Sequence, residues 1–495
     1  MRRLVLFFCL LSLPFLLCAA DAPKRELRAV WIATVGNIDW PSRQGLSAQQ
    51  QQQEFISQLN FLQRSGFNAV IVQVRPAADA FYPSPYEPWS KYLTGKQGQP
   101  PFPKYDPLEF MINETHKRNM EFHAWFNPYR ALVSSSSNPN PPNHATRTHP
   151  EWVISYGGKS YFDPGNPEVR EYILKVILDA VERYDIDAVH IDDYFYPYPV
   201  AGKPFPDQRS YAKYNNGQSR EDWRRGNVNL FISQLNTNIK KEKPWVKFGV
   251  SPFGIWRNIA DDPEGSATRG SSCYDDLYSD VRLWIERKWI DYVAPQLYWE
   301  HGHRAAAYDV LLPWWKKNSG QRQLFIGLGL YRMQDARTAP WNSPNEILKQ
   351  IRAARAIHTN GFIFYSASVF NKIGPAITDS LQQRYFGTIA IPPAMPWIDP
   401  TPPPAPEARI AVTNNGLLLQ WDEHNPQKEP LKYLVYRFDR NEPADLSNAS
   451  RIIALTQLTS FTDREGSRNY KYVVTALDRT WNESAPSNAV FLTTP

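Results

Sequence analysis

Two adjacent carboxylates, Asp192 and Asp193, directly follow an apolar stretch at 188–191 and precede a run of aromatic residues and prolines that ends at Pro199. Moving an ionised carboxylate out of water costs several kcal/mol unless it is paired, hydrogen-bonded or functional. A helix N-cap or a buried ion pair would explain one aspartate. Two aspartates between a buried strand and aromatic side chains such as Tyr194 indicate a site that binds or cleaves sugars, because aromatic rings stack on the apolar faces of sugar rings.

Alternation along the predicted strands places further polar side chains near this pair, since residues i and i+2 of a strand share a face. The polar residues that share a face within one strand are Gln73 and Arg75, His123 and Asn127, His190 and Asp192, and Gln296, Tyr298 and Glu300. If this face points into a barrel, the last member in each strand lies at the open end of the barrel, with Asp79 and Asp193 close behind. We predict substrate contacts from Arg75, Asp79, Asn127, His190, Gln296, Tyr298, Trp299 and Tyr194.

Two carboxylates on different strands suit the hydrolysis of a glycosidic bond, in which one acid protonates the leaving oxygen and one carboxylate attacks or stabilises the sugar. We assign Asp192 as the nucleophile or electrostatic stabiliser, because Arg75 and Asn127 could hold its charge. Asp193 faces away if the strand persists and replaces Asp192 if it does not. The sequence leaves open both this choice and whether the anomeric configuration is retained or inverted.

Glu300 is the predicted acid/base. Its neighbours Tyr298 and Trp299 offer apolar surroundings of the kind that raise a carboxyl pKa toward neutrality. A cap, or an ion pair with His301 or His303, is the structural alternative for this residue.

Two other functions compete with this hypothesis. A metal-dependent hydrolase or deacetylase could use His190, Asp192, His301 and His303, since His301 and His303 have the spacing of metal ligands. A non-catalytic sugar-binding scaffold would use the same carboxylates only to accept hydrogen bonds. We predict no metal and no cofactor for the glycosidase.

The elements that must position these residues alternate between strand and helix eight times. The predicted strands span 28–35, 69–76, 121–130, 188–191, 247–254, 292–300, 324–332 and 361–368. Eight such units predict an α/β fold, a (β/α)8 TIM barrel over 24–388, with parallel strands and right-handed crossovers. The loops after the strands are longer than those before them, which places the site at the carboxyl ends of the strands.

The remainder of the chain has a different pattern. Residues 389–406 are rich in proline and predict a stiff, extended linker. Residues 407–495 contain short alternating strands, which predict a small all-β, immunoglobulin-like sandwich. The spacing of its aromatic residues resembles a fibronectin type III module, for which we predict attachment to the cell envelope or spacing from it.

The amino-terminal residues 1–20 have the charged start, short apolar run and small final residues of a secretory signal peptide, so we expect a periplasmic or cell-envelope protein. Leu17 stands before Cys18 where a lipid-attachment signal has a small residue, which argues against a lipoprotein. We predict no transmembrane segment. The net charge is +6 without a basic run, which gives no support for nucleic-acid binding.

Several long strings of residues resemble the glycosyl-hydrolase-like 10 family. They are RELRAVWIATVGNIDWPS (25–42), NAVIVQVRPAADAFYPS (68–84), EPWSKYLTG (87–95), HAWFNPYR (123–130), YFDPGNPEVR (161–170), HIDDYFYPYP (190–199) and APQLYWE (294–300). The resemblance implies a barrel glycosidase of the bacterial envelope that cleaves peptidoglycan glycan strands, particularly strands stripped of stem peptides. By the same resemblance, the family motifs share Asp39, Arg75, Asp79, Asn127, Asp192, Asp193 and Glu300. We also predict substrate contacts from Asp39 and Trp40.

Overall fold

The computed structural model describes residues 22–133, 140–335, 338–422, 425, 429 and 431–493. The predicted signal peptide at 1–20 lies outside these residues. Within the described ranges, no helix has the length and apolar character needed to cross a membrane.

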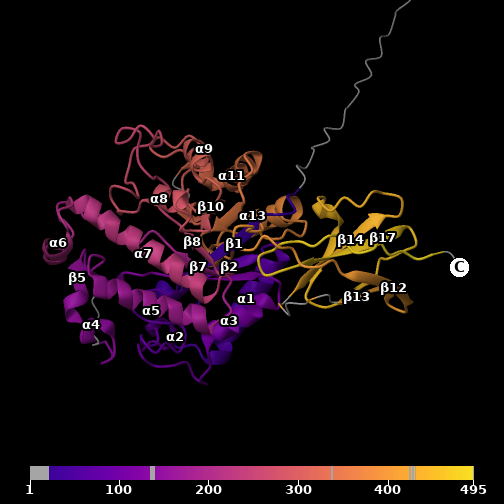
Figure 1. Cartoon of the computed structure of the whole chain (residues 1–495), viewed down its shortest axis with the longest axis horizontal. Helices are drawn as coiled ribbons and strands as arrows, with labels where there is room; N and C mark the ends of the chain where they lie inside the picture. Colours follow the sequence, from indigo (N-terminus) through magenta and orange to yellow (C-terminus); the bar gives the residue numbers. More distant parts are fainter. Residues whose placement is uncertain are drawn as a thin grey trace, which may run out of the picture.

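Eight parallel strands close into a barrel in the order β1-β11-β10-β9-β8-β7-β3-β2. They are β1 (Leu27–Ile32), β2 (Ala69–Arg75), β3 (Glu121–Phe126), β7 (Ala188–Ile191), β8 (Lys247–Val250), β9 (Tyr292–Val293), β10 (Gln323–Leu328) and β11 (Gly361–Phe364). The predicted (β/α)8 barrel is therefore confirmed. The barrel forms the larger part of the molecule in Figure 1.

Amphipathic helices surround the barrel. In α1 (Ala48–Arg64), the Ser47 side chain and Gln50 form a capping box, and Phe55 and Leu62 are buried against the sheet. The other helices of the barrel are α2 (Lys91–Thr94), α3 (Pro107–His116), α4 (Ala145–Thr148), α5 (Pro167–Arg183), α6 (Gln208–Tyr214), α7 (Arg220–Glu242), α8 (Val281–Glu286), α9 (Tyr308–Asn318), α10 (Arg332–Asp335), α11 (Asn345–Ala356), α12 (Ala367–Phe370) and α13 (Pro375–Ser380).

The connection that follows β3 carries a small antiparallel sheet of its own. This sheet has the order β4-β6-β5 and consists of β4 (Arg130–Leu132), β5 (Val153–Tyr156) and β6 (Lys159–Phe162). It begins directly beyond the carboxyl end of β3. Inserted structure therefore lies on the face where the site was predicted.

The interior of the barrel is packed around Tyr292. Its hydroxyl lies 3.0 Å from Nδ1 of His123 and 2.9 Å from Nδ1 of His190. A Cβ atom on Gly249 would lie only 2.0 Å from the Tyr292 ring, so the neighbouring strand needs glycine at this position. The ring and both histidines are buried and form a packed floor beneath the carboxyl ends of the strands.

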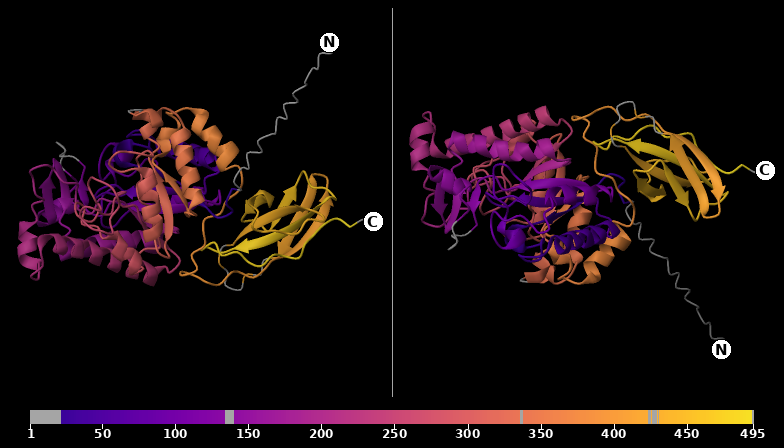
Figure 2. Two further views of the ribbon diagram at one scale, coloured as in Figure 1. Left: turned by 90° about the horizontal axis from the view of Figure 1, so that it is seen from above. Right: turned by 90° about the horizontal axis from the view of Figure 1, so that it is seen from below.

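The carboxyl-terminal residues form two antiparallel sheets, with the orders β12-β13-β16 and β15-β14-β17. Their strands are β12 (Glu407–Thr413), β13 (Gly416–Asp422), β14 (Lys432–Asp439), β15 (Ile452–Thr456), β16 (Ser460–Asp463) and β17 (Tyr470–Leu477). Both views in Figure 2 show this β domain at one end of the barrel. The small all-β unit is therefore present, and its assignment as fibronectin type III stays a prediction.

The proline-rich segment between the two parts packs against the barrel. Ile391 forms a parallel β-bridge with Arg25, and Ile391 and Met395 are buried. Gln323, the first residue of β10, donates from Nε2 to the carbonyl oxygens of Pro393 and Ala394. This segment therefore covers the amino-terminal ends of the strands, opposite the predicted site.

Candidate active site

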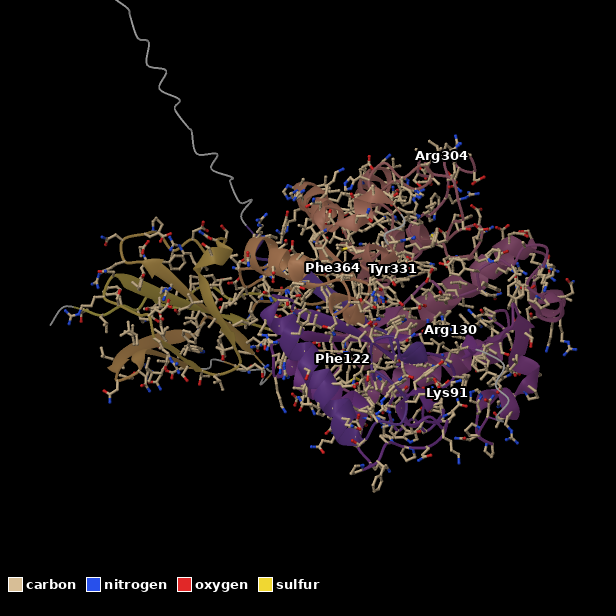
Figure 3. The ribbon with its side chains drawn as sticks, turned by 180° about the vertical axis from the view of Figure 1, so that it is seen from behind. Lys91, Phe122, Arg130, Arg304, Tyr331 and Phe364 are labelled. Atoms are coloured by element: carbon tan, nitrogen blue, oxygen red, sulfur yellow. The ribbon has the colours of Figure 1, made fainter. Side chains whose placement is uncertain are left out.

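A cavity of about 410 Å³ opens at the carboxyl ends of the barrel strands. The residues that line it are Trp31, Val35, Ile38, Gln73, Trp125, Arg130, Asp192, Asp193, Tyr194, Tyr198, Ser251, Phe253, Gln296, Tyr298, Trp299, Tyr331, Arg332 and Tyr365. Figure 3 labels two of them, Arg130 and Tyr331. Asp192 and Asp193 are the two carboxylates among these described lining residues, and half of the wall is aromatic.

Asp192 follows β7 directly and accepts hydrogen bonds at both carboxylate oxygens. Its Oδ2 accepts from Nε1 of Trp125 at 3.2 Å and from Nδ2 of Asn127. Its Oδ1 accepts from the backbone N–H of Tyr194 at 3.2 Å. The last residues of β3 and the turn after β7 therefore fix the carboxyl group in one orientation.

A second layer of hydrogen bonds orients Asn127. Gln73 accepts at Oε1 from the backbone N–H groups of Thr34 and Val35, at 3.0 and 2.9 Å. Its Nε2 then donates to Oδ1 of Asn127, which leaves the Asn127 amide N–H to donate to Asp192. Gln73 thus connects the turn after β1 to the carboxylate.

Asp193 lies in the same cavity and has different partners. Its Oδ2 accepts from the hydroxyl of Tyr198, and its Oδ1 accepts from Nε2 of Gln296 at 3.2 Å. Gln296 also donates to the carbonyl oxygen of Ser251 at 3.0 Å, which ties this side of the site to the end of β8.

The two carboxyls share a buried and electrostatically crowded position. Burial, and next the charge of Asp193, raise the pKa of Asp192 to about 7. Burial also raises the pKa of Asp193. Arg130 opposes these shifts and lies with its guanidinium 4.6 Å from the ring centre of Tyr194. The pair therefore retains a proton close to neutral pH, so that one carboxyl can act as an acid while the other carries a negative charge.

The aromatic walls come from several strand ends. Trp31 at the end of β1 donates from Nε1 to Nε2 of His190, 3.2 Å away, and this contact fixes the indole over the barrel floor. Tyr298 and Tyr365 stack with their ring centres 6.1 Å apart. Such surfaces match the apolar faces of a sugar ring.

The structure brings together seven of the predicted residues. Five of them, beside the two aspartates, line the cavity or contact the pair: Asn127, Tyr194, Gln296, Tyr298 and Trp299. His190 lies one layer below, fully buried, and contacts Trp31, Tyr292 and Ser251. It supports the floor of the cavity and does not line it.

Glu300 does not line this cavity. Its Oε2 accepts from Nε1 of Trp341 at 2.9 Å. The expected strand over 292–300 is only two residues long. Gln296 and Tyr298 still line the cavity, as the alternation predicts, but Glu300 does not, and the expected pairing of Glu300 with Asp192 is not seen.

Arg75 is also directed elsewhere. Its guanidinium donates to both carboxylate oxygens of Glu87, at 2.9 and 2.6 Å, and to the carbonyl oxygen of Pro128. The register between β2 and β3 shifts between Gln73 and Arg75, which breaks the alternation. Arg75 therefore fixes the loops around the site and does not reach the charge of Asp192.

Three further predicted residues lie outside the cavity. Asp79 lines a separate cavity of about 690 Å³, and its Oδ1 is buried without a hydrogen-bond partner. Asp39 accepts from the N–H of Ala33 and from the hydroxyl of Ser366, both at 2.8 Å, and so joins the ends of β1 and β11. Trp40 is fully buried and packs against α1.

Sequence reasoning missed Arg130, Trp31 and Tyr365. Arg130 follows β3 by four residues and begins β4, but the strand predicted over 121–130 ran through it and concealed this position. Trp31 and Tyr365 stand at strand ends within apolar stretches, where an aromatic residue looks like core. Their position at the end of a strand was the available signal.

The histidines of the metal-dependent alternative do not converge. His301 lies with Nδ1 2.7 Å from Glu346 on α11, whereas His190 contacts the barrel floor. Across the described part of the chain, no three His, Cys, Asp or Glu side chains are grouped to hold a metal ion.

Similar proteins are found among known families, sequences and structures. The model of the family described as glycosyl hydrolase-like 10 matches residues 26–343. The chain is 47% identical over 488 residues to glycosyl hydrolase YngK of Bacillus subtilis, covering 96% of this chain and 95% of that one. It is 39% identical over 374 residues to glycosyl hydrolase DigH of Escherichia coli K12, covering 70% and 84%. The PgaB glycoside hydrolase domain of Bordetella bronchiseptica superposes with a TM-score of 0.48 and 12% identity, covering 73% and 99%.

Proposed function

The chain belongs to the glycosyl hydrolase-like 10 family, and from this premise we propose that it hydrolyses the glycosidic bonds of a glycan at Asp192 and Asp193. One observation carries the proposal. Two buried carboxyls share an aromatic cavity at the carboxyl ends of the barrel strands. Family membership supports the reaction class, and the geometry of the cavity supports the choice of residues.

We assign the two carboxyls different roles from their surroundings. Burial and the charge of Asp193 keep a proton on Asp192 up to a pH of about 7. Asp192 is then the general acid that protonates the leaving oxygen, and in the second half-reaction the general base that activates water. Asp193 holds the negative charge that stabilises the positive charge developing on the sugar.

Asp192 takes the acid/base role that the sequence analysis assigned to Glu300, and Asp193 takes the role of charged stabiliser that it assigned to Asp192. The pKa of a general acid works best close to the operating pH, and Asp192 meets this condition by burial and by the neighbouring charge. Glu300 lies outside the cavity, hydrogen-bonded to Trp341, and has no contact with either aspartate among the described interactions.

The proposed substrate is the glycan strand of peptidoglycan, particularly strands without stem peptides. The resemblance of the sequence motifs to the family supports this choice. Aromatic walls at Trp31, Trp299 and Tyr365 suit the repeated pyranose rings of such a strand. We also propose export across the inner membrane, because residues 1–20 have the pattern of a secretory signal.

The test of the function compares polymers. The purified protein is incubated with glycan strands stripped of stem peptides by an amidase, with intact peptidoglycan and with xylan, and new reducing ends are counted. We expect release from the stripped strands, less from intact peptidoglycan and none from xylan. Asp192→Asn should abolish release, whereas the control Asp379→Asn, at an exposed position, should not change it.

Other outcomes would change the proposal in distinct ways. Release from xylan alone would keep the hydrolase and replace the substrate. No release from any polymer, with equal binding by the wild type and Asp192→Asn, would make the protein a sugar-binding scaffold.

Export has a separate test. Cell fractionation of the full chain and of a variant without residues 1–20 should place the first in the envelope fraction and the second in the cytoplasm. Equal retention of both in the cytoplasm would contradict the proposed export.

A further inference from the structure

We propose that the sugar cleaved by this enzyme carries a 2-acetamido group and that the carbonyl oxygen of this group, not a protein carboxylate, attacks the anomeric carbon. This inference rests on the proposed function and deepens it. It concerns the nucleophile, which the assignment of an acid and a charged partner leaves open.

The two carboxyls lie beside each other in the chain, at the end of one strand. A glycosidase with a protein nucleophile has carboxyls that flank the scissile bond about 5–5.5 Å apart. Asp192 and Asp193 are consecutive residues beyond one strand, β7, so they do not come from strands on opposite sides of the cavity. The other described residues that line the cavity carry no carboxylate that could attack from the opposite side.

Hydrogen-bond donors hold all four carboxylate oxygens. Asp192 accepts from Trp125, Asn127 and the Tyr194 N–H, and Asp193 accepts from Tyr198 and Gln296. Donors on both oxygens stabilise a charge and reduce its tendency to bond to carbon. A carboxylate held in this way is suited to accept one more N–H, that of an amide.

The walls of the cavity place apolar surface beside polar groups. An acetamido group presents a methyl group, an N–H and a carbonyl oxygen within a few ångströms. The cavity offers indole and phenol rings from Trp31, Trp125 and Tyr365 beside the aspartates, so apolar surface and an N–H acceptor lie next to each other. A 2-hydroxyl group would leave this apolar surface without a partner.

The reaction then proceeds in two steps. The acetamido oxygen bonds to C1, the bond from C1 to the leaving oxygen breaks, and that oxygen takes the proton of Asp192. The cyclic oxazolinium carries its N–H proton on the nitrogen, hydrogen-bonded to ionised Asp193. Water next bonds to C1 while Asp192 takes a proton from that water. The bond between C1 and the oxazolinium oxygen breaks, this oxygen becomes the amide carbonyl again, and the anomeric configuration is retained.

The experiment uses matched substrates. Glycan strands stripped of stem peptides are chemically de-N-acetylated and then re-acylated, one batch with acetyl and one with trifluoroacetyl groups, and kcat and KM are measured with the full chain. Fluorine withdraws electrons from the carbonyl oxygen, so we expect kcat on the trifluoroacetyl glycan to fall at least tenfold with little change in KM. A thiazoline derived from N-acetylglucosamine, which mimics the oxazolinium, should inhibit competitively.

The possible failures are distinguishable. Equal kcat on both batches, or a covalent sugar on Asp192 or Asp193 detected by intact mass after treatment with a 2-fluoro sugar, would overturn the inference and leave the glycosidase intact. Inverted products would also overturn it. No cleavage of even the re-acetylated batch would overturn both this inference and the proposed function.

Discussion

Asp192 combines two properties that seldom occur together, full burial and a proton that leaves near neutral pH. Its pKa of about 7 arises first from burial and next from the charge of Asp193. The donors Asn127 and Tyr194 lower the pKa without cancelling these causes. The function of the residue follows from this balance, since an acid must still hold its proton when the substrate arrives.

The balance makes a prediction for the pH dependence of catalysis. We expect kcat/KM to fall above a pH of about 7 as Asp192 loses its proton. Asp193→Asn removes the neighbouring charge, so the pKa of Asp192 should decrease and the basic limb of the residual activity should move to lower pH. Initial rates between pH 4 and 9 measure both limbs. A basic limb at the same pH in the variant would contradict the coupling.

The same pKa makes a prediction for stability. Its folded value of about 7 lies above the ordinary value of 3.8, so the folded protein binds this proton more tightly than the unfolded chain. The stability that this group contributes is therefore full below pH 4 and is lost as the pH rises through 7. Asp192→Asn cannot ionise, so it should raise the melting temperature, relative to the wild type, more at pH 8 than at pH 5.

Calorimetry at the two pH values measures this difference. The control Asp379→Asn, at an exposed carboxylate, should show no such dependence on pH. An equal shift for Asp192→Asn at both pH values would show that the carboxyl is not protonated in the folded protein.

At the scale of the elements, sequence reasoning succeeded where the strand pairing is uninterrupted. The strand predicted over 188–191 is observed as β7, and the strand predicted over 121–130, although β3 ends at Phe126, placed Asn127 where it meets Asp192. It failed where the ladder is interrupted. The strand β9 is only two residues long and Glu300 lies seven residues beyond its end, outside the cavity, and the register shift in β2 redirects Arg75. The alternation of side-chain direction holds only while a strand stays paired in regular register. Neither interruption changes the apolar pattern from which the strands were predicted.

The new position of Arg75 gives a prediction at this scale. Arg75→Ala should leave Glu87 as an unpaired buried charge and destabilise the protein by about 3–5 kcal/mol. Because Arg75 lies outside the cavity, the KM of the folded enzyme should change little. Denaturant unfolding and steady-state kinetics separate the two effects, with Arg64→Ala, an exposed arginine at the end of α1, as the control. A large increase in KM with unchanged stability would restore Arg75 as a substrate ligand.

At the scale of the whole molecule, the β domain closes the end of the barrel opposite the active site. Trp481 is buried, donates from Nε1 to Glu121 at the start of β3, and lies with its ring centre 4.4 Å from Nζ of Lys432. Arg25 donates to the Trp481 carbonyl oxygen at 2.8 Å. The sequence indicated a second domain but not this contact, because a single tryptophan in a loop does not reveal which surface it meets.

This contact predicts that the β domain stabilises the barrel. Trp481→Ala should lower the free energy of unfolding by about 3–5 kcal/mol, the usual cost of deleting a buried tryptophan. The partly exposed Trp397→Ala is the matched control and should cost less. Cleavage rates at 25 °C should stay unchanged for both, because the cavity lies at the other end of the barrel. Unfolding curves in urea test the order of the two variants, and equal curves would contradict it.

The central claim is that Asp192 and Asp193, and not Glu300, perform the reaction. The most direct measurement is the rate of reducing-end release from stripped glycan strands by Asp192→Asn, Asp193→Asn and Glu300→Gln, each confirmed as folded by its unfolding curve. We predict losses of at least a hundredfold for the two aspartate variants and a rate close to the wild type for Glu300→Gln. Loss of activity in Glu300→Gln, with activity retained in either aspartate variant, would contradict the account.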